Sequence, residues 1–138
     1  MLIRRAEPGE IDACARLYER VLRETFTWAP PSGRAAADFR AAATLEEVYV
    51  ARDDDGLLGF ASLYRPDSFL HSLYVLARGR GVGKALLDHV TQIADGRLTL
   101  KCEVPNTRAQ AFYLREGFRV VEEGCDPGMA VGWRRMSR

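Results

Sequence analysis

Residues 73–87 read LYVLARGRGVGKALL, which begins like a buried strand and ends like an amphipathic helix. The turn between these two parts contains Gly79, Gly81 and Gly83 and the basic residues Arg78, Arg80 and Lys84. Glycines at a strand-to-helix turn let backbone N–H groups point into a common space, because no Cβ intervenes. The first turn of the helix adds N–H donors without helical partners and the positive end of the helix dipole. The stretch therefore predicts a site for a phosphate-sized anion.

Two familiar nucleotide motifs do not fit this turn. A P-loop requires glycine five positions before its Gly-Lys pair and Ser or Thr after it, where this chain has Arg78 and Ala85. A dinucleotide fingerprint that starts at Gly79 requires its third glycine at the position of Lys84. The pattern that remains is Arg78-x-x-Gly81-x-Gly83.

The flanking sequence predicts alternating strands and helices from hydrophobic spacing and from Gly and Pro punctuation. Strands are expected at residues 1–5, 47–52, 57–64, 69–75, 98–104, 118–122 and 129–136. Helices are expected at residues 10–25, 35–43, 82–93 and 106–116, with Asn106 as an N-cap and Gly117 at a C-terminal cap. This order predicts one α/β (α+β) domain over residues 1–138, in which a mixed sheet carries helices on both faces.

Composition excludes several functional classes. The formal net charge is +1 over 138 residues, so no overall field favours nucleic acid or an acidic membrane surface. No basic helix or aromatic-basic strand pattern favours a nucleic-acid module. The three cysteines are widely spaced and form no zinc pattern, so we expect no metal and a reducing cytoplasm. No apolar run has the length of a membrane span or the form of a signal peptide.

Two motifs together resemble one family. Arg78-x-x-Gly81-x-Gly83 resembles the acyl-CoA-binding signature of the GCN5-related N-acetyltransferases, Gln/Arg-x-x-Gly-x-Gly/Ala. Residues 106–118, NTRAQAFYLREGF, resemble the family segment Asn-x-x-Ala-x-x-Phe-Tyr-x-x-x-Gly-Phe, and residues 3–18 resemble its first strand and helix. One departure is the loop before Arg78, which is about two residues shorter than in many members and lacks the usual proline. This shortening affects the expected direction of the Arg78 side chain more than the positions of the glycines.

The resemblance implies the acyl-CoA N-acyltransferase fold, with a mostly antiparallel sheet of six to seven strands and about four helices. It also implies acetyl-CoA, or coenzyme A, as co-substrate. Backbone amides across residues 78–84 would take the pyrophosphate, and the pantetheine arm would run beside residues 73–75 like an added strand. The strand at residues 98–104 would diverge to make room for the arm. The implied cofactor-binding residues are Leu73, Tyr74, Val75, Arg78, Gly79, Arg80, Gly81, Val82, Gly83, Lys84, Asn106, Ala109 and Phe112, the last two being equally compatible with plain core packing.

The implied chemistry is attack of a neutral amine on a thioester. Tyr113 fills the tyrosine of the family's Phe-Tyr pair and is the candidate acid, with a core aromatic as the alternative. His71 lies near a position where several members carry glutamate or histidine and is the candidate base, with a chain of waters as the alternative. Glu103 is a weaker candidate, because it faces away from the inward side of its strand.

The resemblance also implies where the acceptor amine binds. The family frames its acceptor pocket with two loops, which here are residues 27–34 and 122–128. Phe26 and Trp28 are candidates for an apolar wall, and the acids Glu122, Glu123 and Asp126 for attracting a cation, although core and solvated roles are the more frequent ones. We expect a small-molecule amine or amino acid rather than a protein lysine or N-terminus. A non-catalytic acyl-CoA sensor of the same fold is the alternative, and the resemblance is compatible with a homodimer.

Overall fold

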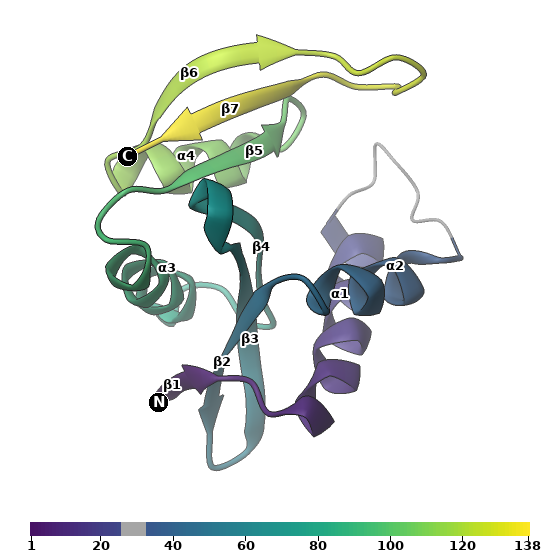
Figure 1. Cartoon of the computed structure of the whole chain (residues 1–138), viewed down its shortest axis with the longest axis vertical. Coiled ribbons are helices and arrows are strands. Elements are labelled where there is room, and N and C mark those ends of the chain that lie inside the picture. Colours follow the sequence, from purple (N-terminus) through teal and green to yellow (C-terminus); the bar gives the residue numbers. More distant parts are fainter. Residues whose placement is uncertain (26–32) are drawn as a thin grey trace.

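The structure is a computed structural model that describes residues 1–25 and 33–138, and these residues form seven strands and four helices (Figure 1). The strands are β1 (Leu2–Arg5), β2 (Glu47–Asp53), β3 (Gly56–Tyr64), β4 (Phe69–Val75), β5 (Thr99–Glu103), β6 (Arg119–Gly124) and β7 (Trp133–Ser137). The helices are α1 (Ile11–Thr25), α2 (Ala35–Ala43), α3 (Val82–Ile93) and α4 (Thr107–Arg115). The predicted order of elements is confirmed.

All seven strands form one sheet in the order β1-β2-β3-β4-β5-β7-β6. Only β4 and β5 pair in parallel, and the other neighbours pair antiparallel. A parallel pair requires a crossover, and α3 provides it between these two strands. The mixed, mostly antiparallel sheet predicted from the sequence is therefore confirmed.

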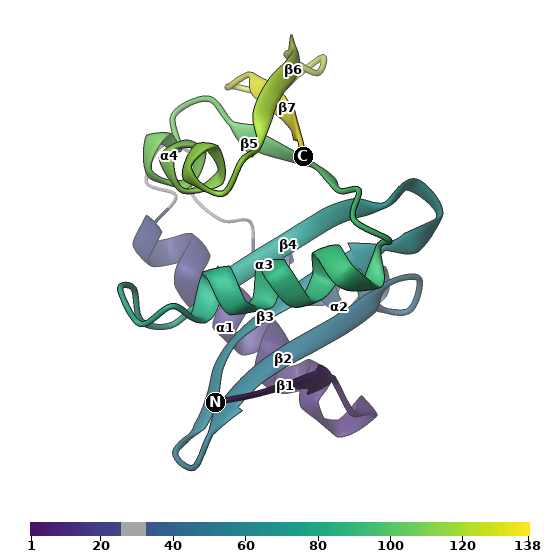
Figure 2. The same ribbon diagram turned by 90° about the vertical axis from the view of Figure 1, so that its left-hand side faces the viewer.

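Helices cover both faces of the sheet, with α1 and α2 on one side and α3 and α4 on the other (Figures 1 and 2). Leu86 and Val90 of α3 are fully buried in the core on their side, whereas Leu17 and Phe39 bury the other face. Phe60 packs under α1 and α2 while its neighbours on β3 face α3. Each such side chain contributes about 1.5–3 kcal/mol by leaving water, so both helical layers hold the sheet.

The ends of several elements follow their sequence signals. The Asn106 side chain accepts a hydrogen bond from the backbone N–H of Ala109 at 3.2 Å, and Gly117 has a φ of 93° just after α4. Both predicted caps are thus confirmed. The last two strands are shifted from the expected ranges, because a turn in which the Met129 N–H donates to the carbonyl of Asp126 (3.1 Å) lies where the final strand was expected to begin.

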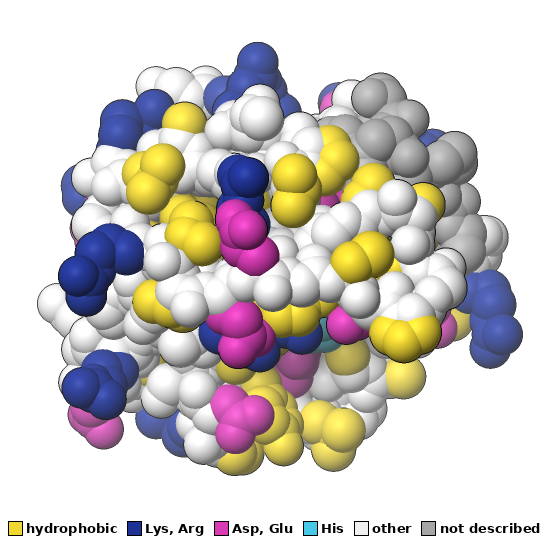
Figure 3. Space-filling model, turned by 90° about the horizontal axis from the view of Figure 1, so that it is seen from above, with side chains coloured by type: hydrophobic (Ala, Val, Ile, Leu, Met, Phe, Trp, Pro, Cys, Tyr) yellow, Lys and Arg dark blue, Asp and Glu magenta, His cyan; other side chains and the backbone are white. Residues whose placement is uncertain are grey.

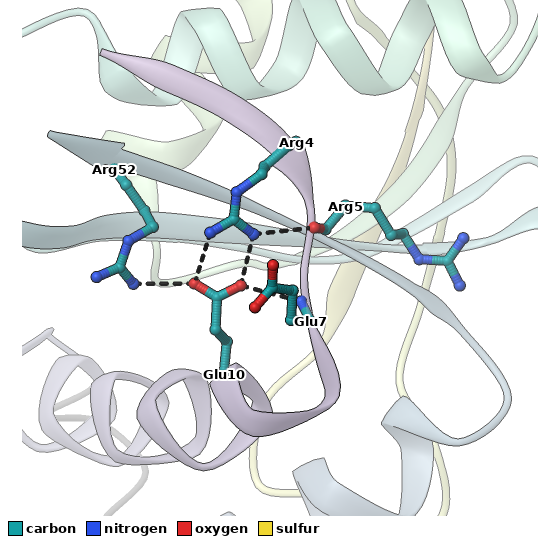
Figure 4. Close-up of polar contacts among 5 residues, drawn as sticks. All are labelled: Arg4, Arg5, Glu7, Glu10 and Arg52. Atoms are coloured by element: carbon teal, nitrogen blue, oxygen red, sulfur yellow. Dashed lines mark hydrogen bonds and ion pairs between the residues drawn. The ribbon is translucent and has the colours of Figure 1, made fainter.

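A carboxylate fastens the N-terminal strand to the start of α1 (Figure 4). Glu10 accepts hydrogen bonds from both terminal nitrogens of Arg4, at 2.6 and 3.1 Å, and one from Arg52 of β2 at 3.0 Å. It also accepts the backbone N–H of Glu7 at 2.9 Å. These contacts lower the pKa of Glu10 to about 2, the Arg4 hydrogen bond being the largest cause.

The opposite edge of the sheet is β6. Val120 and Val121 are exposed there, and Val121 lies at an irregularity in the pairing with β7. Glu122 and Glu123 pair with arginines of β7. Seen from above, this end shows separate hydrophobic side chains with charged ones between them (Figure 3). A charged, irregular edge disfavours the addition of a further strand. Among the helices of residues 1–25 and 33–138, none combines the length and the apolarity that crossing a bilayer requires.

Candidate active site

The site begins where β4 and β5 separate. Within the described residues these strands pair only at Phe69 with Thr99 and at Leu70 with Leu100. Beyond that point Leu73–Val75 keep their partners on β3 but have none on β5. A cleft of about 1200 Å³ occupies the wedge and is lined by both strands, α1, α3, α4 and the β6–β7 loop. One edge of β4 is therefore available for main-chain hydrogen bonds with a ligand.

The glycine turn closes one end of this cleft. Gly79 and Gly81 have φ values of 77° and 74°, a left-handed conformation that glycine adopts without strain. Gly81 is the N-cap of α3, and an added Cβ at either glycine would meet nothing within 4 Å. Gly79, Gly81, Val82 and Gly83 all line the cleft. The predicted N–H donors are thus grouped at one end of an open cavity.

The three basic residues of the turn lie in different surroundings. Arg78 is exposed and lines the cleft. Arg80 does not line it and instead lies 3.5 Å from a carboxylate oxygen of Asp53. Lys84 lines the cleft, but its Nζ donates to Glu116 at 2.8 Å, and this hydrogen bond raises its pKa. Only Arg78 therefore presents a charge to the cleft in the way that the sequence suggested.

Helix α4 supplies the wall opposite α3. Asn106, Ala109, Phe112 and Tyr113 all line the cleft, as the family segment implied. The Tyr113 ring packs edge-on against Phe112 and Phe118, with ring centroids 5.2 and 5.5 Å apart. Burial raises the pKa of the Tyr113 phenol, and the Cys102 thiol adds to the shift. The phenol therefore stays protonated at neutral pH and can donate a hydrogen bond in the cleft.

His71 borders the same cleft but is already engaged. Its Nδ1 lies 2.7 Å from Oε2 of Glu46, a residue 25 positions away in the chain. That hydrogen bond raises the pKa of His71, and its side chain is 49% exposed. A histidine with a raised pKa spends less of its time neutral near pH 7, so Glu46 weakens it as a base.

The far end of the cleft contains several residues that the sequence analysis did not name, beside Glu103 and Asp126, which it did. Tyr18, Val21 and Glu24 of α1 line it, as do Glu103 and Trp133. Asp126 also lines it and accepts a hydrogen bond from Trp133 Nε1 at 3.2 Å. Of the acids named as acceptor candidates, Glu122 and Glu123 lie outside the cleft lining and pair with β7. Phe26 and Trp28 lie outside the described residues.

Two sequence signals pointed toward this end. Tyr18 is on the amphipathic face of α1, and Glu103 alternates with the buried Leu100 and Cys102 on β5. Glu103 is therefore on the face of β5 that points away from α3 and α4. It lines the cleft because β4 has separated from β5 at this level. Among the described residues, no group of three or more His, Cys, Asp or Glu side chains is arranged to hold a metal ion.

The fold and the motifs agree with known proteins. The sequence profile of the acetyltransferase (GNAT) family matches residues 13–118. The chain belongs to the GNAT family. This GNAT is 30% identical over 124 residues to the peptidyl-lysine N-acetyltransferase YjaB of Salmonella typhimurium, a match that covers 86% of this chain and 83% of that protein. It is 34% identical over 83 residues to the 5-NmdU N-acetyltransferase of Pseudomonas phage PaMx11, which covers 55% and 59% of the two chains.

The solved structures agree on the fold. The GNAT superposes on yncA of Salmonella typhimurium, solved with its cofactor acetyl-CoA, with a TM-score of 0.76 at 21% identity. That likeness covers 100% of this chain and 92% of the other. The family match and the two relatives make this chain an acetyltransferase of the GNAT family, and the solved structure agrees with its fold.

Proposed function

We propose that this GNAT transfers the acetyl group of acetyl-CoA to the primary amine of a small molecule or amino acid, by direct attack within a ternary complex. The observation that carries the proposal is the edge of β4 at Leu73–Val75, which is free of β5. That edge leads to the glycine turn and shares its cleft with Tyr113. The arrangement offers one end for phosphate, a strand edge for the arm and a phenol for the leaving sulfur.

The residues present fit acetyl-CoA. The cleft, about 1200 Å³, exceeds the usual range of about 300–1,000 Å³ for small-molecule pockets, which suits a long cofactor. An extended pantetheine arm can pair with β4 as an added strand. The pyrophosphate would meet the open side of Gly79 and Gly81 and the first N–H groups of α3. Arg78, and Arg115 of α4, line the same cleft and supply positive charge.

The proposed chemistry uses few groups of the chain. An alkylammonium, with a pKa near ~10.4, must lose a proton before its nitrogen attacks the thioester carbon. Backbone N–H groups on the free edge of β4 are the candidates for stabilising the oxyanion that forms. The protonated Tyr113 phenol donates a hydrogen bond to the departing sulfur. Because its pKa is raised, it stabilises the thiolate by hydrogen bonding more than by full proton transfer.

The lining at the far end of the cleft supports the proposed acceptor class. Carboxylates of Glu24 and Asp126 and apolar side chains of Val21, Met129 and Val131 line that end. Such a lining suits a compact cationic amine with an apolar body. The two relatives are named for different acceptors, peptidyl-lysine and 5-NmdU. The three cysteines are free thiols, which supports a cytoplasmic location.

The cofactor part is tested by thermal stability. Acetyl-CoA at about 100 times its Kd should add about 2.7 kcal/mol. Dephospho-CoA, which keeps the pyrophosphate, should stabilise nearly as well, and ATP should not. Gly81→Asp should abolish the shift, because it sets an anion beside the phosphate. Gly128→Asp is the matched control: Gly128 also has a positive φ with open space around it, but it lies outside the cleft lining. Equal stabilisation by ATP would contradict the proposal.

The reaction is tested by thiol release. Acetyl-CoA is incubated with a panel of small amines, amino acids and lysine peptides, and free thiol is followed. We expect release with at least one small amine. Stabilisation by acetyl-CoA without thiol release from any acceptor would favour the acyl-CoA sensor instead.

A further inference from the structure

Glu103 lies on the last position of β5, in the open part of the wedge. The parallel register that pairs Leu70 with Leu100 sets Glu103 at the level of Leu73, on the free edge of β4. His71, in contrast, directly follows the last paired residue of β4, at the closed end. Glu103 therefore lies beside the stretch of β4 where the arm of the cofactor would run.

The Glu103 side chain lines the cleft together with Tyr18 of α1 and Tyr74 of β4. Burial is the largest cause of the raised pKa of both phenols, and the Glu103 charge adds to it. Tyr113 on α4 also adds to the raised pKa of Tyr74. The ring centroids of Tyr18 and Tyr74 are 5.1 Å apart, so these two side chains are in contact. Glu103 therefore shares the cleft with a pair of contacting tyrosines, one from α1 and one from β4.

The backbone holds Glu103 in place. Its carbonyl accepts the N–H of Asn106 at 2.9 Å and the side-chain amide of Gln110 at 3.2 Å, and it is in register with Trp133 of β7. A catalytic group needs this kind of fixed support from the residues around it. The support comes from β5, β7 and α4 together.

Among the described residues, the other three carboxylates that line the cleft stand on elements other than β5. Glu24 accepts a hydrogen bond from Arg20 at 3.1 Å, and Asp126 accepts one from Trp133. Glu116 binds Lys84 at the phosphate end. Glu103 differs from all three because it stands on β5, across the wedge from the free edge of β4.

We propose that Glu103, rather than His71, takes the proton from the acceptor amine. The assignment rests on the proposed function. The carboxylate accepts a proton from the alkylammonium, and the neutral nitrogen forms a bond to the thioester carbonyl carbon. The nitrogen then loses its second proton to solvent, the carbon–sulfur bond breaks, and the thiolate leaves and takes up a proton. Glu103 then gives its proton to solvent, so ammonium and acetyl-CoA give amide, coenzyme A thiol and one released proton.

The test compares Glu103→Gln with His71→Gln on an alkylamine acceptor. Glu103→Gln should lower kcat about 10²-fold or more, and His71→Gln should stay at least about tenfold more active than Glu103→Gln. Glu103→Asp should recover part of the rate. Stabilisation by acetyl-CoA should persist in all three variants. Glu19→Gln, a carboxylate of α1 outside the cleft lining, is the matched control.

A second acceptor separates proton transfer from structural damage. An O-alkyl hydroxylamine is already neutral at the assay pH, so Glu103→Gln should lose at least about tenfold less rate with it than with the alkylamine. Three results would each overturn the assignment of Glu103 but not the proposed function. They are equal losses with both acceptors, a Glu103→Gln rate close to wild type, and a larger loss in His71→Gln than in Glu103→Gln. Absence of thiol release by the wild type with every amine would overturn the proposed function and this assignment with it.

Discussion

Tyr113 shows how one side chain serves both packing and the proposed chemistry. Its ring is held between Phe112 and Phe118, and the residue lines the cleft. The same burial that orders the ring raises its pKa and so keeps it a hydrogen-bond donor over the whole physiological range. The core-aromatic and functional readings of Tyr113 are therefore compatible.

Tyr113→Phe should lower kcat by about 10²-fold, because the sulfur would leave without its donor. The Phe112 and Phe118 contacts involve the ring alone, so thermal stability and stabilisation by acetyl-CoA should stay near wild type. Tyr64→Phe, which removes a phenol outside the cleft lining, is the control. A Tyr113→Phe enzyme with full kcat would show that the sulfur departs without help from this residue.

The positions of residues were predictable from the sequence where a local backbone pattern fixes them. They were less predictable where a contact with a residue far away in the sequence fixes them. The glycines and the α4 face line the cleft because strand-turn-helix geometry places them there. The pairing of His71 with Glu46 and that of Arg80 with Asp53 depend on how the β2–β3 hairpin lies beside β4. The spacing of residues within a motif carries no information about such contacts.

At the scale of elements, Glu10 joins β1, β2 and the start of α1 through four hydrogen bonds. Its side chain is only 14% exposed. Its pKa falls from an ordinary 4.5 to about 2 because the charged form is the one bonded to Arg4 and Arg52. A depressed carboxylate pKa stabilises the fold at pH values above the unfolded pKa, and this contribution disappears as pH falls through the folded pKa.

Glu10→Gln should therefore lower the free energy of unfolding by about 1 kcal/mol at pH 7, a value discounted for partial exposure to solvent. The difference from wild type should shrink below pH 4.5 and be nearly gone near pH 2. Urea denaturation at a series of pH values measures it. Glu24→Gln, which breaks the exposed pair with Arg20, should change stability little at any pH. A constant difference between pH 7 and pH 3 would contradict the linkage.

The element boundaries show the same division between local and distant causes. The N-cap of α4, the turn between β2 and β3 and the end of α4 depend on single residues, and the sequence located them. The start of β7 depends on pairing with β5, which begins at Glu103 with Trp133. Residues 129–132 have strand-like composition but lie beyond that pairing, so the expected strand began too early.

The whole molecule is a sheet in two parts, β1–β4 and β5–β7–β6, joined by two residue pairs between β4 and β5. The sequence predicted the strands and the divergence by resemblance. The residues at the far end of the cleft depend on how α1 lies against β5 and β7, which no local pattern encodes. A ligand that pairs with β4 in the wedge would bridge both parts of the sheet.

Hydrogen exchange should report this bridging. On addition of acetyl-CoA, the amides of Leu73–Val75 and of residues 79–84 should exchange at least about tenfold more slowly, because main-chain hydrogen bonds and phosphate contacts protect them. Amides of β1 and β2 already pair with strands on the far side of the sheet from the wedge, so their rates should change little. Gly81→Asp with acetyl-CoA, and wild type with ATP, provide the matched negative controls. Protection confined to residues 79–84, with Leu73–Val75 unchanged, would mean that the phosphate end binds while the arm does not add to β4, and the direct-attack geometry would then need a different path for the thioester.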